Sequence, residues 1–226
     1  MDFVSRNSLK NILLSRRRKG FYFTLDPSPV FMNFKAPKNI EEYTKRRYWE
    51  ERYRGENEVV YDWFQSVYSS FLDSIKERMK HPSMVLNIGC GDSRLPLDLS
   101  DHFMINVDFS ATVLKKMNRL APESNWMTGS ICEKVFRSDT FDVIIDKATL
   151  DALFSDGSSP WDPSEEARKS VSMCIESMYS ALKPGGIFIS LSLGQPHFRR
   201  AFYEQKSWSD SSYLCLGLYH LYIYHK

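Results

Sequence analysis

Residues 84–93 have the sequence MVLNIGCGDS. The first five residues form a short apolar run, and Gly89 and Gly91 follow within three positions, a pattern that predicts a buried strand entering a tight turn. Glycines in such a turn let the backbone approach a ligand closely and leave amide groups facing it at the start of a helix. We therefore expect a ligand site directly after this strand.

The rest of the chain continues this alternation of apolar runs and helical patterns. Strands that alternate with helices predict a doubly wound α/β sheet that is parallel except for an antiparallel last strand. Ligands of such sheets bind at the carboxyl ends of the strands, so the turns after the strands are the candidate functional positions. Further strands are predicted at 103–107, 142–146 and 186–193, and 214–224 closes the chain as an apolar strand or hairpin arm. Helices are predicted at 110–120 and 164–182, the second ended by a turn at 183–186.

Two helices are predicted before the sheet, at 39–53 and 61–79. Residues 1–38 differ, because prolines favour turns there and the first 25 residues carry six Lys or Arg against the single acid Asp2. We interpret 1–38 as a basic tail and 39–226 as one folded domain. The tail composition is compatible with a mitochondrial presequence, a nuclear address or a solvated segment, and its scattered apolar residues favour the last of these.

The composition narrows the class of protein. A chain of 226 residues with 42% hydrophobic and 26% charged residues can bury the core of one α/β domain. Its 30 basic and 28 acidic residues nearly cancel, and no basic stripe with interleaved aromatics predicts nucleic-acid binding. Four separated cysteines without a CxxC pair argue against disulfides and a metal site, and no apolar run approaches the roughly 20 residues of a membrane span.

A carboxylate follows the second predicted strand. Asp108 lies 17 residues after Gly91, where it can accept two hydrogen bonds from a ribose diol. A dinucleotide fingerprint would add a small residue at the position of Arg94. A nucleoside without a pyrophosphate, such as S-adenosylmethionine, therefore fits the motif better than NAD.

Longer stretches carry a resemblance that extends from Tyr43 to the C-terminus. The sequence resembles the seven-stranded, Rossmann-like S-adenosylmethionine-dependent methyltransferases that modify lysines of translation elongation factor 1-alpha. The glycine motif is shared by that whole superfamily, whereas DKATLDAL, QPHFR and the aromatic stretches before the sheet are more specific to this subfamily. The matching stretches are YWEERY (48–53), YDWF (61–64), LNIGCGDS (86–93), NVDFS (106–110), FDVIIDKATLDALF (141–154), LKPGGIFISLS (182–192), QPHFR (195–199) and YHLYIYHK (219–226).

The resemblance implies which residues hold S-adenosylmethionine. Aromatic faces suit a sulfonium cation and an adenine ring, although aromatic residues before the sheet could equally pack the helices onto it. Ser130 stands where relatives carry an acid that binds the adenine amino group, and Ala148 where they carry glycine, so weaker cofactor binding is expected; Asp92 for asparagine is a milder change. The implied cofactor residues are Trp49, Tyr53, Tyr61, Gly89, Gly91, Asp108, Phe109, Gly129, Ser130, Ile131 and Lys147.

Methylation of a lysine requires a neutral amine that attacks in line. At pH 7, removing its proton costs roughly 4.6 kcal/mol. We hypothesise that Asp146, Asp151 or His197 accepts or relays this proton, because these residues flank turns at the edge that faces the transferred group. The alternatives are a helix cap for Asp151 and a hydrogen-bonded turn residue for His197.

Together these features predict a protein-lysine N-methyltransferase that uses S-adenosylmethionine and acts as a monomer, without a metal or a membrane. Elongation factor 1-alpha or a related protein is the expected substrate, and the cytoplasm the expected compartment, with the mitochondrion as the alternative that the basic tail leaves open. Two other functions stay open. One is methyl transfer to a small molecule or a mitochondrial protein, and the other is a non-catalytic module that binds the cofactor.

Overall fold

The computed structural model describes residues 12–16, 21–25, 37–54 and 60–226 of a chain that divides into two compact units, Met1–Ala36 and Pro37–Lys226. In the first unit, β1 (Ile12–Arg16) pairs with β2 (Phe21–Leu25) in an antiparallel hairpin. The sequence analysis predicts turns here and no strand. Both strands are rich in Ile, Leu, Phe and Tyr, which favour extended backbone. The assignment of residues 1–38 as a tail stays a prediction.

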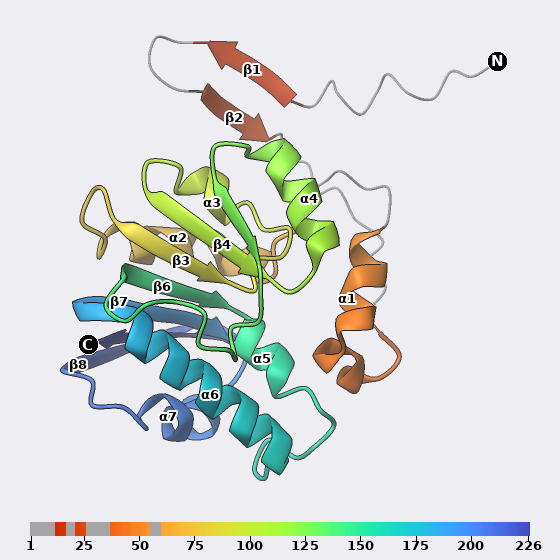
Figure 1. Ribbon diagram of the computed structural model, residues 1–226, viewed down its shortest axis with the longest axis vertical. Coiled ribbons are helices and arrows are strands. Elements are labelled where there is room, and N and C mark those ends of the chain that lie inside the picture. Colours follow the sequence, from red (N-terminus) through yellow and green to blue (C-terminus); the bar gives the residue numbers. More distant parts are fainter. Residues whose placement is uncertain (1–11, 17–20, 26–36, 55–59) are drawn as a thin grey trace. The chain divides into compact units, whose positions relative to one another are not determined.

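The second unit contains a single seven-stranded sheet (Figure 1). Its strand order is β5-β4-β3-β6-β7-β9-β8, and β9 runs in the opposite direction to the other six strands, which confirms the predicted Rossmann-like sheet with an antiparallel last strand. Because β4 and β6 flank β3 on opposite sides, the chain order reverses at β3, where such sheets bind ligands. The strands are β3 (Met84–Ile88), β4 (Phe103–Asp108), β5 (Asn125–Thr128), β6 (Phe141–Lys147), β7 (Leu182–Ser192), β8 (Asp210–Leu216) and β9 (Tyr219–His225).

Two helices, α4 and α6, begin at a serine whose side chain caps them. The Ser110 and Ser164 hydroxyls accept from the amides of Val113 at 3.4 Å and Ala167 at 3.1 Å, as N-caps do. In the described part of the chain, no helix has the length and apolar character needed to cross a membrane. The elements are η2 (Ile40–Thr44), α1 (Arg46–Tyr53), η3 (Gln65–Val67), α2 (Tyr68–Lys76), α3 (Leu95–Asp98), α4 (Ala111–Leu120), α5 (Thr149–Leu153), α6 (Glu165–Ala181) and α7 (Pro196–Tyr203).

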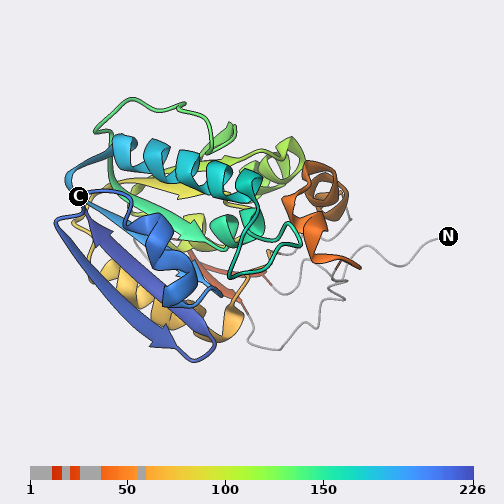
Figure 2. The same ribbon diagram turned by 90° about the horizontal axis from the view of Figure 1, so that it is seen from below.

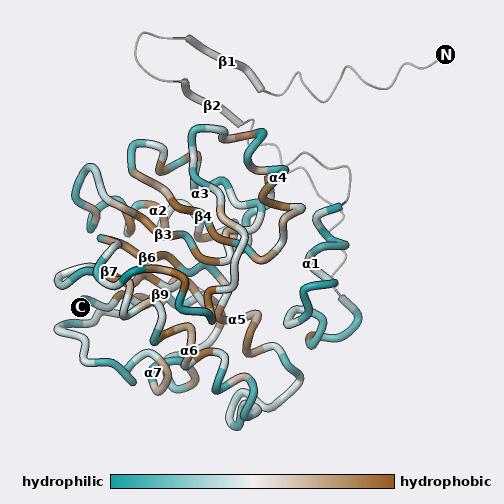
Figure 3. Tube along the Cα trace, viewed as in Figure 1, coloured by the Kyte–Doolittle hydropathy of each residue, from teal (hydrophilic) through white to brown (hydrophobic). Residues whose placement is uncertain are grey.

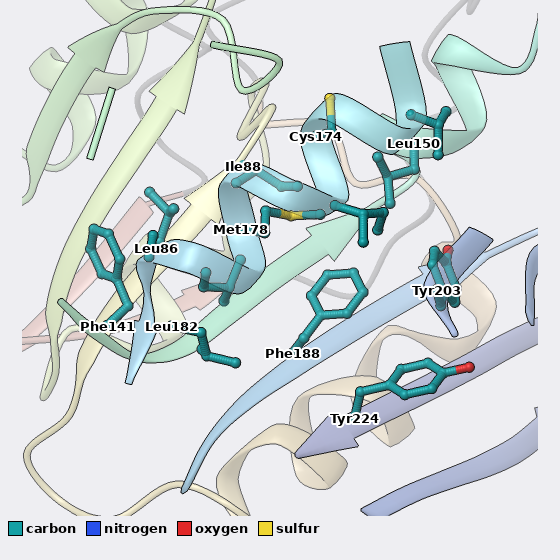
Figure 4. Packing of buried hydrophobic residues seen from close by; sticks show 14 of the residues in the cluster. Leu86, Ile88, Phe141, Leu150, Cys174, Met178, Leu182, Phe188, Tyr203 and Tyr224 are labelled. Atoms are coloured by element: carbon teal, nitrogen blue, oxygen red, sulfur yellow. The ribbon is translucent and has the colours of Figure 1, made fainter. Parts of the chain in front are cut away.

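Helices cover both faces of the sheet, with α6 on one side and α2 on the other (Figure 2). Successive strand residues alternate between these layers, since Leu86 and Ile88 pack with α6 and α7 while Val85 packs with α2 and α3. Figure 4 shows Leu86 next to Phe141 of β6 and Ile88 close to Met178 of α6. Parts of β3, β4 and β6 are accordingly drawn in brown, the hydrophobic end of the scale (Figure 3). Burial on both faces explains why these strands read as continuous apolar runs.

Three predicted elements differ in detail. The helix predicted at 39–53 is broken at Lys45, whose extended backbone separates η2 from α1. The helix predicted at 61–79 is regular α-helix only in α2, because Phe64 adopts a left-handed conformation at φ 65°. The turn predicted at 183–186 lies inside β7, with Gly185 at φ 75° and a register shift against β6. In each case a local irregularity interrupts a pattern that looked periodic.

Asp146, at the end of β6, ties the sheet to α5. Its carboxylate accepts from the amides of Thr149 and Leu150 at 3.0 and 3.2 Å and from the Ser190 hydroxyl at 2.7 Å. The side chain is almost completely buried, and this burial raises its pKa to about 7 against those hydrogen bonds. Asp146 therefore caps α5 and bridges β6 to β7.

Replacing Asp146 tests this role. Asp146→Ala leaves two amides and a hydroxyl without their acceptor, so we expect a loss of about 2–4 kcal/mol in the free energy of unfolding, whereas Asp146→Asn keeps an acceptor for both amides and costs less. Because burial raises the pKa of Asp146, the folded wild type binds the proton of this carboxyl more tightly than the unfolded chain does. The free energy of unfolding of the wild type therefore falls as pH rises from about 4 to 7. The melting temperature of Asp146→Asn minus that of wild type should therefore increase from pH 5 to pH 8; a difference that is constant with pH would contradict this account.

Candidate functional site

A cavity of about 260 Å³ opens at the carboxyl ends of β3, β4 and β6. Its walls come from the turns after these strands, from the segment after β5 and from the residues between η2 and η3. All eleven residues that the sequence analysis assigns to the cofactor line this one cavity, and of the three catalytic candidates Asp151 does so too. The lining residues include Trp49, Tyr53, Tyr61, Gly89, Gly91, Asp108, Phe109, Gly129, Ser130, Ile131, Cys132, Lys147, Asp151 and Leu193.

The turn after β3 requires glycine at two positions. Gly89 and Gly91 both have φ 51°, a left-handed conformation that side chains disfavour. A Cβ at Gly89 would collide with Thr149, whose hydroxyl donates to the carbonyl of Ile88 at 3.0 Å. A Cβ at Gly91 would press against the Tyr53 hydroxyl at 3.0 Å. The absence of side chains therefore lets backbone form this part of the cavity wall.

Asp108 lies at the end of β4 and faces the same turn. One carboxylate oxygen accepts from the amide of Gly91 at 2.9 Å and the other from the amide of Ser110 at 2.8 Å. Burial raises its pKa to about 6, opposed by these two hydrogen bonds and assisted by the nearby charges of Glu50 and Asp92. An ionised carboxylate has about four acceptor positions, so Asp108 can still accept from two hydroxyl groups.

Aromatic residues from before the sheet form the opposite wall. Trp49 stacks on Tyr53 with ring centroids 5.9 Å apart, and Tyr61 meets Trp63 edge to face at 5.6 Å. The guanidinium of Arg52 lies over both Tyr61 and Trp63, at 5.1 and 5.4 Å from their centroids. Burial raises the pKa of the Tyr53 phenol well above its ordinary value, so this hydroxyl stays neutral. The wall combines flat apolar faces with neutral polar edges.

Two further contacts fasten this wall to the sheet. Thr112 of α4 donates to Glu50 of α1 at 2.5 Å, and the Tyr61 amide donates to the carbonyl of Asp92 at 3.0 Å. The Asp92 carboxylate forms an ion pair with Lys116 at 3.0 Å. The acid at position 92 is therefore balanced by a cation from α4.

A buried ion pair joins the two walls. Lys147 lies 3.2 Å from Asp62, and both side chains are almost fully buried. Asp62 also accepts from the Ser93 hydroxyl and from the Arg94 amide at 3.1 Å, so its charge is satisfied on both oxygens. The sequence analysis includes Asp62 only as a letter of the YDWF stretch and does not single it out. Nothing in the periodicity of that stretch marks this acid as the partner of a lysine 85 residues later.

The segment after β5 forms a third side of the cavity. The Gly129 amide donates to the carbonyl of Asp108 at 3.1 Å, which places Ser130 and Ile131 beside Phe109. The Ser130 hydroxyl accepts from the amide of Cys132 at 3.3 Å. At the position where the sequence analysis expects a contact with adenine, this chain therefore presents the neutral hydroxyl of Ser130.

Asp151 of α5 stands at the outer edge of the cavity. One of its oxygens accepts from Ser192 at 2.5 Å and from the Arg199 guanidinium at 2.9 Å, and the other from the Leu193 amide at 2.7 Å. Arg199 also lies over the Phe154 ring at 4.1 Å from its centroid. This network fixes the chain that leaves β7 against α5 and α7.

The other two catalytic candidates lie elsewhere. Asp146 is not among the residues that line the cavity, and its oxygens are engaged by α5 and Ser190 as described above. His197 is exposed at the start of α7, where it stacks on Trp161 with ring centroids 4.9 Å apart. In the described part of the chain, no group of three or more His, Cys, Asp or Glu side chains could hold a metal ion.

Comparisons with known proteins agree with this geometry. A family profile described as a methyltransferase domain matches residues 86–190. The chain is 34% identical over 170 residues to the protein named EEF1A lysine methyltransferase 4 of Bos taurus, covering 72% of this chain and 66% of that one. It is 32% identical over 201 residues to the Mus musculus protein of the same name, covering 84% and 78%. The chain belongs to the EEF1A lysine methyltransferase 4 family.

It is therefore an S-adenosylmethionine-dependent methyltransferase. Its fold is similar to that of the N-methyltransferase NodS from Bradyrhizobium japonicum WM9, solved with S-adenosyl-L-homocysteine, at a TM-score of 0.57 and 13% identity over 79% of this chain and 96% of that one. The cavity fits the cofactor, since the glycine turn presents bare backbone, Asp108 has acceptor positions for a ribose diol, and the aromatic wall suits an adenine and a sulfonium.

The pH dependence of cofactor binding tests the role of Asp108. The ionised Asp108 carboxylate can accept hydrogen bonds from two hydroxyl groups, and its pKa is raised to about 6. The affinity for S-adenosylhomocysteine should therefore fall as pH drops from 7.5 to 5, by up to about tenfold for each pH unit below the pKa. Asp108→Asn should bind about 10- to 100-fold more weakly at pH 7.5 and lose this pH dependence. Titration calorimetry measures both effects. Asp101→Asn, which alters an exposed carboxylate before the same strand, should bind like wild type; equal pH profiles for wild type and Asp108→Asn would remove Asp108 from the site.

Proposed function

We propose that this methyltransferase transfers a methyl group to the side-chain amine of a lysine in translation elongation factor 1-alpha. The extent of the sequence similarity to a curated relative supports elongation factor 1-alpha as the substrate. The methyltransferase profile matches residues 86–190, whereas the similarity to the Mus musculus protein named EEF1A lysine methyltransferase 4 extends over 201 aligned residues. It therefore includes parts of the chain outside the shared cofactor-binding core.

The cavity favours the neutral form of an incoming amine. When bound, S-adenosylmethionine supplies an electrophilic methyl group on a sulfonium. Tyr43, Trp49 and Trp63 line the cavity and exclude water from the entering amine; this loss of hydration disfavours an ammonium ion, and the cation–π attraction of the rings offsets only part of it. Removing the proton at pH 7 costs roughly 4.6 kcal/mol. Desolvation of the lysine by the aromatic wall lowers part of this cost.

Asp151 is placed to orient the amine. It lines the cavity and is held by Arg199, Ser192 and the Leu193 amide, so its carboxylate has a fixed position at the edge. A fixed carboxylate attracts the cationic side chain from solvent and then accepts a hydrogen bond from the neutral amine. The proton itself passes to solvent on the open side of the cavity. Arg199 is a positioning residue, because it acts through Asp151.

The same substitution at two aspartates five residues apart separates catalysis from folding. Asp151→Asn should lower kcat by about tenfold or more, because the amine loses its fixed acceptor, while the dissociation constant for S-adenosylhomocysteine changes little. Asp146→Asn, five residues away and outside the cavity lining, should keep kcat within about threefold of wild type. Steady-state methyl transfer with each variant measures this contrast. Equal losses in the two variants would show that Asp151 acts through the fold and not on the amine.

Transfer of labelled methyl from S-adenosylmethionine tests the proposed function as a whole. Purified elongation factor 1-alpha and a lysate from cells that lack this protein are incubated with wild type, Asp108→Ala and the control Asp101→Asn. We expect one labelled protein with wild type and the control, none with Asp108→Ala, and a methylated lysine in its mass spectrum. Label found only in small molecules would replace the proposed function by small-molecule methylation. Cofactor binding without any label would favour a non-catalytic module.

A further inference from the structure

An exposed tryptophan stands in the loop between α5 and α6, which follows the rim of the cavity. Trp161 has 75% of its surface exposed. One side of the ring stacks on His197 at an interplanar angle of 23°, and its edge meets Phe198 at 4.7 Å between centroids. A large aromatic ring that is held in place yet left open to solvent is the typical anchor of a protein interface.

The loop holds this ring in a defined position. Asp156 accepts from the Ser158 amide at 3.0 Å and from the hydroxyls of Ser158 and Ser164. Arg168 donates to the carbonyl of Pro163 at 2.9 Å and to Asp162 at 2.8 Å. Trp161 therefore needs little ordering when a partner binds, which lowers the entropic cost of association.

The loop is continuous with the mouth of the cavity. Ser155 at its start lines the cavity, and the Glu41 side chain packs closely against Gly157. Ile40 beside Glu41 and Leu193 before α7 line the cavity as well, and they are 58% and 55% exposed. Apolar side chains thus extend from inside the cavity onto the surface that carries Trp161.

The charge of this surface selects the kind of partner. Residues 154–166 contain Asp156, Asp162, Glu165 and Glu166 and no lysine, arginine or histidine, and Arg168, which pairs with Asp162 at 2.8 Å, balances one of these four acids. Glu41 adds another exposed carboxylate from η2. An acidic surface repels nucleic acid and attracts a basic protein segment, and an exposed indole attracts an ammonium or guanidinium group over its face.

We propose that Ile40, Trp161, Asp162, Leu193 and His197 form a docking rim for a basic loop of the folded protein substrate. A lysine or arginine near the acceptor lysine lies over Trp161 while the acceptor itself enters the cavity past Leu193. This assignment rests on the proposed function, because it concerns the protein that delivers the lysine. It gives His197 a place in substrate docking in place of proton transfer.

Steady-state kinetics on full-length variants test the docking rim. The acceptor is elongation factor 1-alpha, or the protein that wild type labels in the lysate. Trp161→Ala should raise the KM for this protein at least tenfold, leave kcat at saturating protein within twofold, and leave the KM for S-adenosylmethionine unchanged. Trp161→Phe, which keeps an aromatic face, should recover most of the loss. Phe103→Ala removes an aromatic ring of 60% exposure at the start of β4, the opposite end of this strand from the cavity, and should behave like wild type.

The outcomes separate this inference from the proposed function. A wild type that methylates no protein overturns the proposed function and the docking rim with it. A wild type that methylates protein, with a Trp161→Ala variant of unchanged KM, overturns the docking rim alone. A fall in kcat at constant KM also overturns it, because docking acts on association. Equal changes in Trp161→Ala and Phe103→Ala would show a general loss of surface stability and likewise count against the rim.

Discussion

The close contact between Gly89 and Thr149 is the constraint on which the site depends. The turn after β3 lacks a side chain at Gly89, and the Thr149 side chain occupies that space while its hydroxyl donates to the carbonyls of Ile88 and Gly89. This contact brings the ends of β3 and β6 together at the point where the chain order reverses. The Gly91 amide then reaches the Asp108 carboxylate at the end of β4. Three strand ends are thereby held in one geometry, and the cavity lies between them.

The sequence predicts the sheet well because strands that are buried on both faces consist mainly of apolar residues. Met84–Ile88 and the apolar centre of Phe141–Lys147 are therefore recognisable without any structure. The glycine turn and Asp108 are recognisable because their chemistry demands particular residue types at particular spacings. The aromatic wall is recognised only through resemblance, since the same residues could have served to pack helices onto the sheet.

The features of the fold and site that the sequence does not predict depend on single backbone angles or on residues far apart in the chain. Lys45 and Phe64 interrupt helices through one unusual conformation each, which a helical pattern does not reveal. Asp146 lies at the end of β6 and Asp151 lies in α5, five residues later, yet one caps α5 and the other faces the cavity. The left-handed conformation of Ala148, at φ 67°, turns the chain between them. Asp62 meets Lys147 across 85 residues, and only the folded sheet brings these two charges together.

The buried acids around the cavity differ in how their charge is balanced, and this difference bears on function. Asp62 faces Lys147 and Asp92 faces Lys116, so both have a cation within 3.2 Å. In the described part of the chain, the Asp108 carboxylate has only the amides of Gly91 and Ser110 as hydrogen-bond partners, and its burial raises its pKa. A charge held without a cation is costly to bury, and the fold retains it in the cavity wall, where the sequence analysis expects a ribose diol. A ligand with two hydroxyl donors and a positive sulfonium stabilises this charge, so the burial of Asp108 favours binding of the cofactor.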